Sequence, residues 1–297
     1  MTTTTAQIGV ESRVSHWLEL TKFRISAVST LTAATGYIAY SRSINAALAG
    51  AVVGTLLMAM ASSALNEVQE REIDAQMVRT RHRPIPSGLV TSRMAVGVAL
   101  LLASTGCAIL FATRGHVPAL LGLLAMVWYN GIYTPLKRMT AFAVVPGSVI
   151  GALPPAIGWA AAGGSLDSPA VLSLCFVFFV WQVPHFWLLA LRHQNDYAKA
   201  GLPTLSRHFS TRQIFRLIFT WTSASVAASA LLVVFQTISG VASAVVVGLI
   251  GVWLLWRFAF MIRASERSPK VFLAFMDINR YAVVIMAAVV LDALFGH

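Results

Sequence analysis

Residues 46–65 read Ala46-Ala-Leu-Ala-Gly-Ala-Val-Val-Gly-Thr-Leu-Leu-Met-Ala-Met-Ala-Ser-Ser-Ala-Leu65, and the next nine read Asn66-Glu-Val-Gln-Glu-Arg-Glu-Ile-Asp74. The first segment has about the 20 apolar residues that a helix needs to cross the hydrocarbon core of a bilayer. The second segment is strongly charged and starts where the first one ends. The junction therefore predicts a membrane-spanning helix that carries polar groups at the membrane surface.

Comparable apolar stretches recur along the 297 residues, of which 57% are hydrophobic and 11% charged, with a mean hydropathy of +0.74. Soluble domains carry roughly 25% charged residues, so this composition rules out a disordered chain and argues against a soluble fold. Unpaired backbone groups cannot face lipid, and no alternating strand pattern indicates a barrel. We therefore predict an all-α polytopic membrane protein with nine transmembrane helices, over residues 25–40, 46–65, 94–112, 117–133, 141–162, 170–191, 214–236, 241–262 and 271–294.

The distribution of positive charge predicts the orientation. Of the 22 Lys and Arg residues, 20 fall near the N-terminus, in the loops after even-numbered spans or in the adjoining parts of the spans, and only Arg42 and Arg114 fall on the other side. Cytoplasmic loops retain positive charge, so we place the N-terminus in the cytoplasm and the C-terminus outside. The same rule explains the net charge of +11 without a nucleic-acid partner.

The whole chain, residues 1–297, is expected to form a single transmembrane domain after a cytoplasmic segment of residues 1–22. The two long cytoplasmic loops, 66–93 and 192–213, are expected to carry the chemistry. The first ten residues have neither an apolar core nor an arginine, so they resemble neither a signal peptide nor a mitochondrial transit peptide. A bacterial plasma membrane is the simplest location. Cys107 and Cys175 lie in apolar stretches, which leaves no disulfide framework and no CxxC metal site.

The charged end of the second span predicts a metal site. If the helix continues, Asn66, Glu70 and Asp74 share one face within about 80°. Oxygen ligands at a membrane mouth suit Mg²⁺, which often shares its remaining positions with substrate phosphates. The alternative is a solvated helix held by ion pairs such as Glu67–Arg71.

The residues that follow favour the metal site over the solvated helix. Arg79, Arg81 and Arg83 come within nine residues of the last carboxylate, and Pro84 and Pro86 then end any helix. Carboxylates beside arginines suit a metal-bridged diphosphate, because the arginines bind the oxygens that the metal leaves free.

These motifs resemble those of a known family. Asn66-xxx-Glu70-xxx-Asp74 with Arg79-Thr-Arg-His-Arg-Pro84 resembles the first signature of the UbiA-type intramembrane prenyltransferases, and the resemblance runs from Lys22-Phe-Arg24 to the last of nine spans. Tyr133-Thr-Pro-Leu-Lys-Arg138 resembles the fourth cytoplasmic-side signature of the family. Three further strings resemble its heme-farnesylating branch: Gly151-Ala-Leu-Pro-Pro-Ala-Ile-Gly-Trp159, Pro184-His-Phe-Trp187 and Asp196-Tyr-xxx-Gly201-xx-Pro203.

The resemblance implies that a farnesyl group passes from farnesyl diphosphate to a vinyl group of heme B, that water adds, and that heme O forms. It implies Mg²⁺ as the cofactor and a lipid environment, and it suggests coupling to a heme A synthase. The implied catalytic metal ligands are Asn66, Glu70, Asp74 and Asp196. The implied diphosphate-binding residues are Arg79, Arg83, Lys137, Arg138 and Lys199, and the implied heme contact is His185.

The second loop departs from the family pattern. Many relatives outside the heme branch have two carboxylates spaced by four there, whereas Ala200 stands four residues after Asp196. Asp196 is therefore expected to hold one Mg²⁺ with phosphate and water, or to orient Lys199; the alternative is that it caps a loop helix. Six aromatic residues of the sixth span are expected either to line an isoprenoid tunnel or to pack against lipid: Phe176, Phe178, Phe179, Trp181, Phe186 and Trp187.

Two other functions are compatible with parts of the sequence. One is a UbiA-type prenyltransferase that acts on an aromatic acid or a quinone precursor, which a complete second carboxylate pair would have favoured. The other is a transporter, which would place ionisable groups near the bilayer midplane and break helices there. Pro146, Pro154 and Pro155 in the fifth span leave room for such breaks, but the charges lie at the cytoplasmic mouth.

Overall fold

A computed structural model describes residues 14–264 and 271–296, and all the regular structure in these ranges is helical. The long helices are α2 (Phe23–Ser41), α3 (Ala46–Gln76), α4 (Ser92–Arg114), α5 (His116–Val127), α8 (Val149–Ala162), α9 (Pro169–Arg192), α11 (Thr211–Val234), α12 (Val241–Ala264) and α13 (Val271–Phe295). The short elements are η1 (Trp128–Tyr133), α6 (Thr134–Leu136), η2 (Ala141–Ala143), α7 (Val144–Gly147), α10 (Gln194–Lys199) and η3 (Leu205–Arg207).

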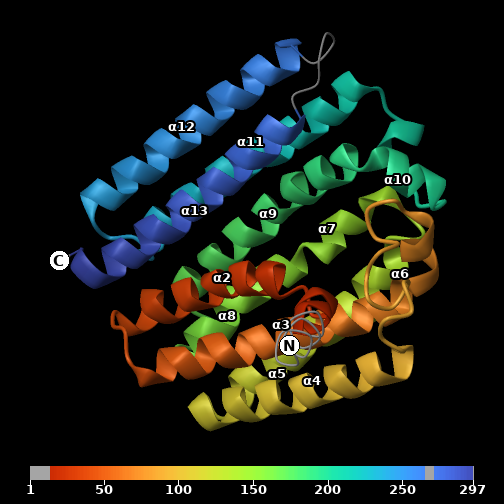
Figure 1. The fold of residues 1–297 in the computed structure, drawn as a ribbon. Helices are drawn as coiled ribbons and strands as arrows, with labels where there is room; N and C mark the ends of the chain where they lie inside the picture. The colour runs from red at the N-terminus through yellow and green to blue at the C-terminus, as the bar shows by residue number, and fades with distance from the viewer. Residues whose placement is uncertain (1–13, 265–270, 297) are drawn as a thin grey trace, which may run out of the picture.

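The helices form two groups that meet side by side (Figure 1). One group contains α3, α4 and α5 with α2 and α8, and the other contains α9, α11, α12 and α13. Contacts of α8 with α9 and of α2 with α13 join the groups. The short elements α6 and α10 lie at one end of the bundle, and the C-terminus lies at the opposite end. Loops from both groups of helices therefore lie at the same end of the bundle, which we call its mouth.

Eight segments of the described chain are long and apolar enough to cross a membrane, and they coincide with the second to ninth predicted spans. The prediction of a polytopic helical membrane protein is confirmed. The first predicted span, residues 25–40, forms α2 and packs against α3, α8 and α13, but its many Ser and Thr residues lower its hydropathy. The total of nine spans and the orientation of the ends stay predictions. Residues 1–13 of the predicted cytoplasmic segment lie outside the described residues.

Glycines allow α2 and α8 to approach closely. A Cβ on Gly36 would lie 2.0 Å from the carbonyl oxygen of Pro155, and one on Gly158 would lie 1.8 Å from that of Ala33. Any side chain at either glycine would push the two backbones apart, as is usual where small residues pack membrane helices. This contact fixes α2, and with it the residue that precedes it, Lys22, against the rest of the bundle.

Two spans are interrupted near the mouth. The fourth continues from α5 as the π-helix η1, a form that often marks functional sites. The fifth is divided into η2, α7 and α8. The two irregular segments pack closely against each other: a Cβ on Gly147 would lie only 2.4 Å from the ring of Tyr133. The breaks therefore shape a cavity at the end of the bundle.

Candidate active site

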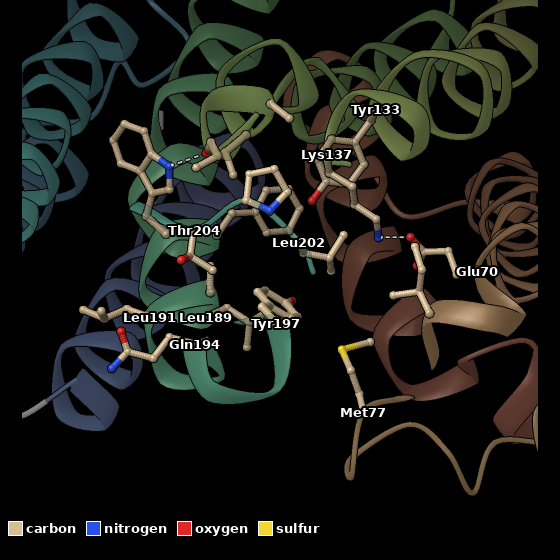
Figure 2. Close-up of a pocket in the computed structure, with 18 of the residues that line it drawn as sticks. Glu70, Met77, Tyr133, Lys137, Leu189, Leu191, Gln194, Tyr197, Leu202 and Thr204 are labelled. Atoms are coloured by element: carbon tan, nitrogen blue, oxygen red, sulfur yellow. Dashed lines mark hydrogen bonds and ion pairs between the residues drawn. The ribbon is translucent and has the colours of Figure 1, made fainter. Parts of the chain in front are cut away.

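The mouth of the bundle contains a cavity of about 270 Å³ (Figure 2). Its walls come from the start of α2, the end of α3, η1, the residues around η2, the end of α9, α10 and residues 202–206. Figure 2 shows Glu70 and Lys137 on one wall, with Gln194, Tyr197 and Thr204 on the other. The two groups of helices therefore both contribute to one site.

The three oxygen-bearing residues of α3 line this cavity, as the helical spacing predicted. Asn66, Glu70 and Asp74 are 1%, 5% and 1% exposed. Each one meets a different cation: Lys22 Nζ lies 2.8 Å from Asn66 Oδ1, Lys137 Nζ lies 2.5 Å from Glu70 Oε1, and an Arg83 guanidinium nitrogen lies 2.6 Å from Asp74 Oδ2. Three polar oxygens from one helix are thus matched by three positive groups from three other segments. We refer to these six residues as the charge cluster.

The end of α3 is built to hold this arrangement. The helix continues to Gln76, so that the polar segment is a direct extension of the membrane span. The buried hydroxyl of Thr80 donates to the carbonyl oxygen of Asp74 and ends the helix. The fully buried Glu67 accepts a 3.0 Å hydrogen bond from the backbone N–H of Ile85, which ties the following loop back to the helix. This return brings Arg83 to the site.

The alternative of a solvated helix with a Glu67–Arg71 ion pair is not what the structure shows. Arg71 pairs with Glu72 at 2.9 Å on the exposed face of α3, while Glu67 points inward. The helix end has an exposed charged side and a buried charged side, and the buried side contains the residues singled out by their spacing.

Lys22 lies immediately before α2, with a backbone φ of 47° and ψ of 44°. This left-handed conformation is uncommon for a residue other than glycine. Burial, together with the nearby positive charges of Arg83 and Lys137, lowers the pKa of the Lys22 amine to about 7. The amine is therefore held close to the boundary between its charged and neutral forms.

Aromatic rings form the deeper side of the cavity. Tyr133 stacks on Tyr129 and on Phe186, with ring centroids 5.8 Å apart in both pairs. Lys137 Nζ lies 5.6 Å from the centroid of the Tyr133 ring. Trp187 also lines the cavity. Of the six aromatic residues noted in the sixth span, only Phe186 and Trp187 face this space; Phe178 is buried elsewhere and Phe176 is exposed.

The predicted residues of the second loop lie outside this wall. Asp196 is half-buried in the first turn of α10 and makes no capping hydrogen bond, and Lys199 is exposed at the end of that helix. Gln194 and Tyr197 of the same helix face the cavity instead. Burial raises the pKa of the Tyr197 phenol, so this group stays a neutral hydrogen-bonding group.

The other predicted residues are distributed as follows. Arg79 lines the cavity from its exposed rim. Arg138 is exposed and donates to the backbone carbonyl of Gln69, which ties the end of the fourth span to α3. His185 lies one residue from Phe186 but outside the cavity lining.

His185 sits between α9 and α13. Its ring lies 4.8 Å from that of Trp181 and 4.9 Å from that of Phe275, measured between centroids. Its Nδ1 atom is buried without a hydrogen-bond partner. A buried polar atom without a partner is unusual and requires an explanation.

The donor set of the charge cluster fits a hard cation. All three potential ligands on α3 are oxygens, from two carboxylates and one amide, as Mg²⁺ prefers. Among the described residues, no three His, Cys, Asp or Glu side chains gather closely enough to hold an ion by themselves. A metal here would therefore take further oxygens from a bound ligand. The nearby cations would suit a polyanionic ligand.

Lys22, Tyr129, Tyr133 and Tyr197 line the cavity but were not among the predicted site residues. The motif strings quoted above contain Lys22, Tyr133 and Tyr197. Their basic or aromatic character within those strings was the signal that could have identified them. Lys22 immediately precedes α2, so that its approach to Asn66 depends on the packing of α2 and not on local spacing.

These features define an integral membrane protein with paired cations and oxygens at one mouth, next to an aromatic-lined cavity between its helices. The chain belongs to the UbiA prenyltransferase family, whose model matches residues 27–279. A protoheme IX farnesyltransferase from Oleidesulfovibrio alaskensis is 36% identical over 277 residues, which cover 93% of this chain and 95% of that protein.

Solved structures share the fold. The structure of a digeranylgeranylglyceryl phosphate synthase matches 95% of this chain and 99% of its own, with a TM-score of 0.76 at 13% identity. A UbiA homologue from Archaeoglobus fulgidus, bound to DMAPP and Mg²⁺, matches 94% of this chain and 98% of its own, with a TM-score of 0.71 at 15% identity.

Proposed function

We propose that this protein transfers a farnesyl group from farnesyl diphosphate to a vinyl group of heme B, with addition of water, to make heme O. The observation that carries the proposal is the charge cluster at the mouth of an aromatic cavity. The nature of the acceptor is supported by relatives called protoheme IX farnesyltransferase, which are similar to this chain over nearly its whole length.

The charge cluster would bind the diphosphate. Asn66, Glu70 and Asp74 would hold Mg²⁺ together with diphosphate oxygens, and the metal, when bound, neutralises negative charge on the leaving group. A solved relative carries a prenyl diphosphate and Mg²⁺ together, which supports this assignment. Asp196 as a further ligand stays a prediction that its position outside the cavity lining does not favour.

The cations of the cluster would then change partners. Lys137 and Arg83 now neutralise the carboxylates of Glu70 and Asp74, and Lys22 donates to the amide oxygen of Asn66. All three are placed to donate to diphosphate oxygens once a metal takes their place. Charge builds up on the diphosphate as the C1–O bond breaks and the bonding electron pair leaves with oxygen. Donors already in position stabilise that charge. Arg79 at the rim extends the same positive surface, whereas Arg138 and Lys199 stay predictions as diphosphate ligands.

The aromatic side of the cavity would hold the other fragment. Loss of diphosphate leaves an allylic cation, which the faces of aromatic rings stabilise. The Tyr133 ring lies beneath Lys137 and stacks on Phe186, so these two residues would offer such faces to the cation. The vinyl group of the acceptor then supplies two electrons to C1, and water adds to the resulting cation and loses a proton. Until that step, the rings must keep water from the allylic cation.

His185 is the residue we propose for heme contact. Its unpaired Nδ1 is compatible with an axial ligand to iron. It lies directly behind Phe186, with 5.7 Å between the two ring centroids, so an acceptor held by His185 would lie next to the aromatic chamber. The position of this chain in a bacterial plasma membrane, and its coupling to a heme A synthase, are part of the same proposal.

Activity of the purified protein tests the proposal. The protein in detergent micelles is incubated with heme B, farnesyl diphosphate and Mg²⁺, and the pigment is analysed by mass spectrometry. We expect heme O to form, and formation to stop when EDTA removes the metal. Replacement of heme B by 4-hydroxybenzoate provides the control for the second class of acceptor. Prenylation of that acid without heme O formation would overturn the assignment.

A further inference from the structure

A second charged cluster lies away from the cavity, between α12 and α13. Asp277 is fully buried, and it accepts hydrogen bonds from Arg257 Nε at 2.9 Å and from an Arg280 guanidinium nitrogen at 3.1 Å. The side chain of Arg257 is 30% exposed and that of Arg280 is 60% exposed. None of these three residues lines the cavity at the mouth.

The cluster lies within membrane-spanning segments. Asp277 is six residues from the start of α13, which corresponds to about 9 Å along the helix, and Arg257 is five residues from the end of its span, or about 8 Å. Ionisable groups at such depths are costly and need partners. One carboxylate neutralises only one of the two guanidinium groups. Among the described residues, no second carboxylate pairs with either arginine, so the three side chains together carry one net positive charge.

The two arginines have unused hydrogen-bond donors. Among the described residues, each arginine donates one hydrogen bond to Asp277, out of the five N–H groups that a guanidinium carries. A planar array of N–H groups binds phosphate or carboxylate oxygens in preference to water. An anion with at least two oxygens would satisfy the donors of both arginines at once.

Apolar residues flank the two arginines. Phe260, three residues after Arg257, is 55% exposed, and Leu273, seven residues before Arg280, is 42% exposed. Positions three or seven apart lie on the same side of a helix. The surface thus combines a cationic centre with apolar flanks, which matches the head and chains of an anionic amphiphile.

We propose that Arg257 and Arg280 bind the phosphate of an anionic phospholipid where α12 and α13 pack together. Basic pockets between membrane helices on the cytoplasmic side bind such head groups. The position of Arg280 on α13 favours a lipid, and not the acceptor of the reaction, as the ligand. His185 meets α13 at Phe275, on the face that packs against α9, whereas Arg280 is on the side of α12. The proposal does not depend on the proposed reaction.

Native mass spectrometry tests this lipid site. Wild-type protein and Arg280→Gln are released from micelles containing phosphatidylglycerol or phosphatidylcholine, and the fraction that keeps a bound lipid is measured. The exposed Arg280 is changed because Arg257 is more buried and its loss endangers folding. We expect wild-type protein to retain phosphatidylglycerol selectively, and Arg280→Gln to retain it at least about fivefold less. Arg216→Gln, at an exposed arginine near the start of α11, should behave as wild type.

A second measurement covers the case of a variant that folds poorly. Phosphatidylglycerol should raise the melting temperature of wild-type protein and of Arg216→Gln, but not that of Arg280→Gln. Equal retention of both lipids by wild-type protein would overturn the proposal. So would equal retention of phosphatidylglycerol by Arg280→Gln, or a variant whose only defect is weaker heme binding in phosphatidylcholine micelles. That last result would assign the arginines to the carboxylates of the acceptor.

Discussion

The two loops at the mouth of the bundle are related in position but differ in chemistry. The first follows α3 and returns Arg83 to the buried carboxylate of Asp74 at the end of that helix, at 2.6 Å. The second carries α10, whose only carboxylate, Asp196, is half-buried beside the cavity, while a phenol and an amide face inward. The first loop therefore presents charged groups to the cavity, and the second presents neutral ones.

This difference indicates where the free energy of catalysis comes from. Buried charges act in a medium of low dielectric constant, where each interaction with a polyanion is strong. A half-exposed carboxylate is screened by water and salt. The first loop should therefore govern turnover, and the second should close the cavity and orient the substrate through Gln194 and Tyr197.

The comparison first requires that both loops lie on the same side of the membrane. In a background with Cys107→Ala and Cys175→Ala, single cysteines are placed at Ser87, at Asn195 and at His116. An impermeant reagent added to intact cells should label only the cysteine at His116, because the charge distribution puts the other two in the cytoplasm. His116 is chosen over Gly115, whose φ of 77° would strain a side chain. Labelling at Ser87 or Asn195 would disprove the predicted orientation.

The carboxylates of the first loop should have the largest effect on rate. Asp74→Asn and Glu70→Gln keep shape but remove charge from the proposed metal site, so we expect turnover to fall by at least about 10². Glu72→Gln, which removes an exposed carboxylate from the same helix, is the matched control and should be nearly normal. Rates of heme O formation are compared at equal amounts of inserted protein. Near-normal rates in both test variants would return these residues to a structural role.

His185 separates binding of the acceptor from binding of the diphosphate. His185→Ala should shift the absorption spectrum of bound heme and weaken heme binding by about tenfold, because an iron ligand is lost. Binding of farnesyl diphosphate with Mg²⁺ should be almost unchanged, since the charge cluster is intact. His82→Ala in the first loop serves as the control. A normal heme spectrum together with lost diphosphate binding would show that the assignment is wrong.

The smallest effect is expected in the second loop. Asp196→Asn removes a half-exposed charge, and such charges contribute up to about 1 kcal/mol. We therefore expect heme O formation to fall by less than about fivefold. The Mg²⁺ concentration needed for half-maximal rate should hardly change. A loss as large as that in Asp74→Asn, with a raised Mg²⁺ requirement, would restore Asp196 as a metal ligand.

The sequence predicted the polar face of α3 well, because that prediction depends only on local helical spacing. A spacing of four residues on a continuing helix places Asn66, Glu70 and Asp74 on one face whatever the tertiary structure, and α3 indeed continues through them. Pro84 and Pro86 predicted the end of any helix after Arg83, but not the return of this loop to α3. The pairing of each oxygen with its own cation was not predictable, because Lys22 and Lys137 reach α3 from distant segments.

The other differences have similar causes. The apolar residues predict the first span, but α2 is held largely by close packing at Gly36 and Gly158. A hydropathy pattern does not reveal such packing. The inward face of α10 depends on how that short helix lies against α9. Spacing alone therefore could not choose between Asp196 and its neighbour Tyr197.

The matched pairs in the charge cluster have a thermodynamic consequence. If the cluster binds Mg²⁺ and diphosphate as proposed, metal alone would have to displace ammonium and guanidinium groups from the α3 oxygens, and diphosphate alone would draw those cations away from buried carboxylates. When both arrive together, the partners are exchanged and no charge is abandoned. The affinities are then coupled, and each ligand must strengthen the binding of the other by the same factor. The mouth would thus behave as a coincidence detector, closed to free magnesium and to bare diphosphate, and open to their complex.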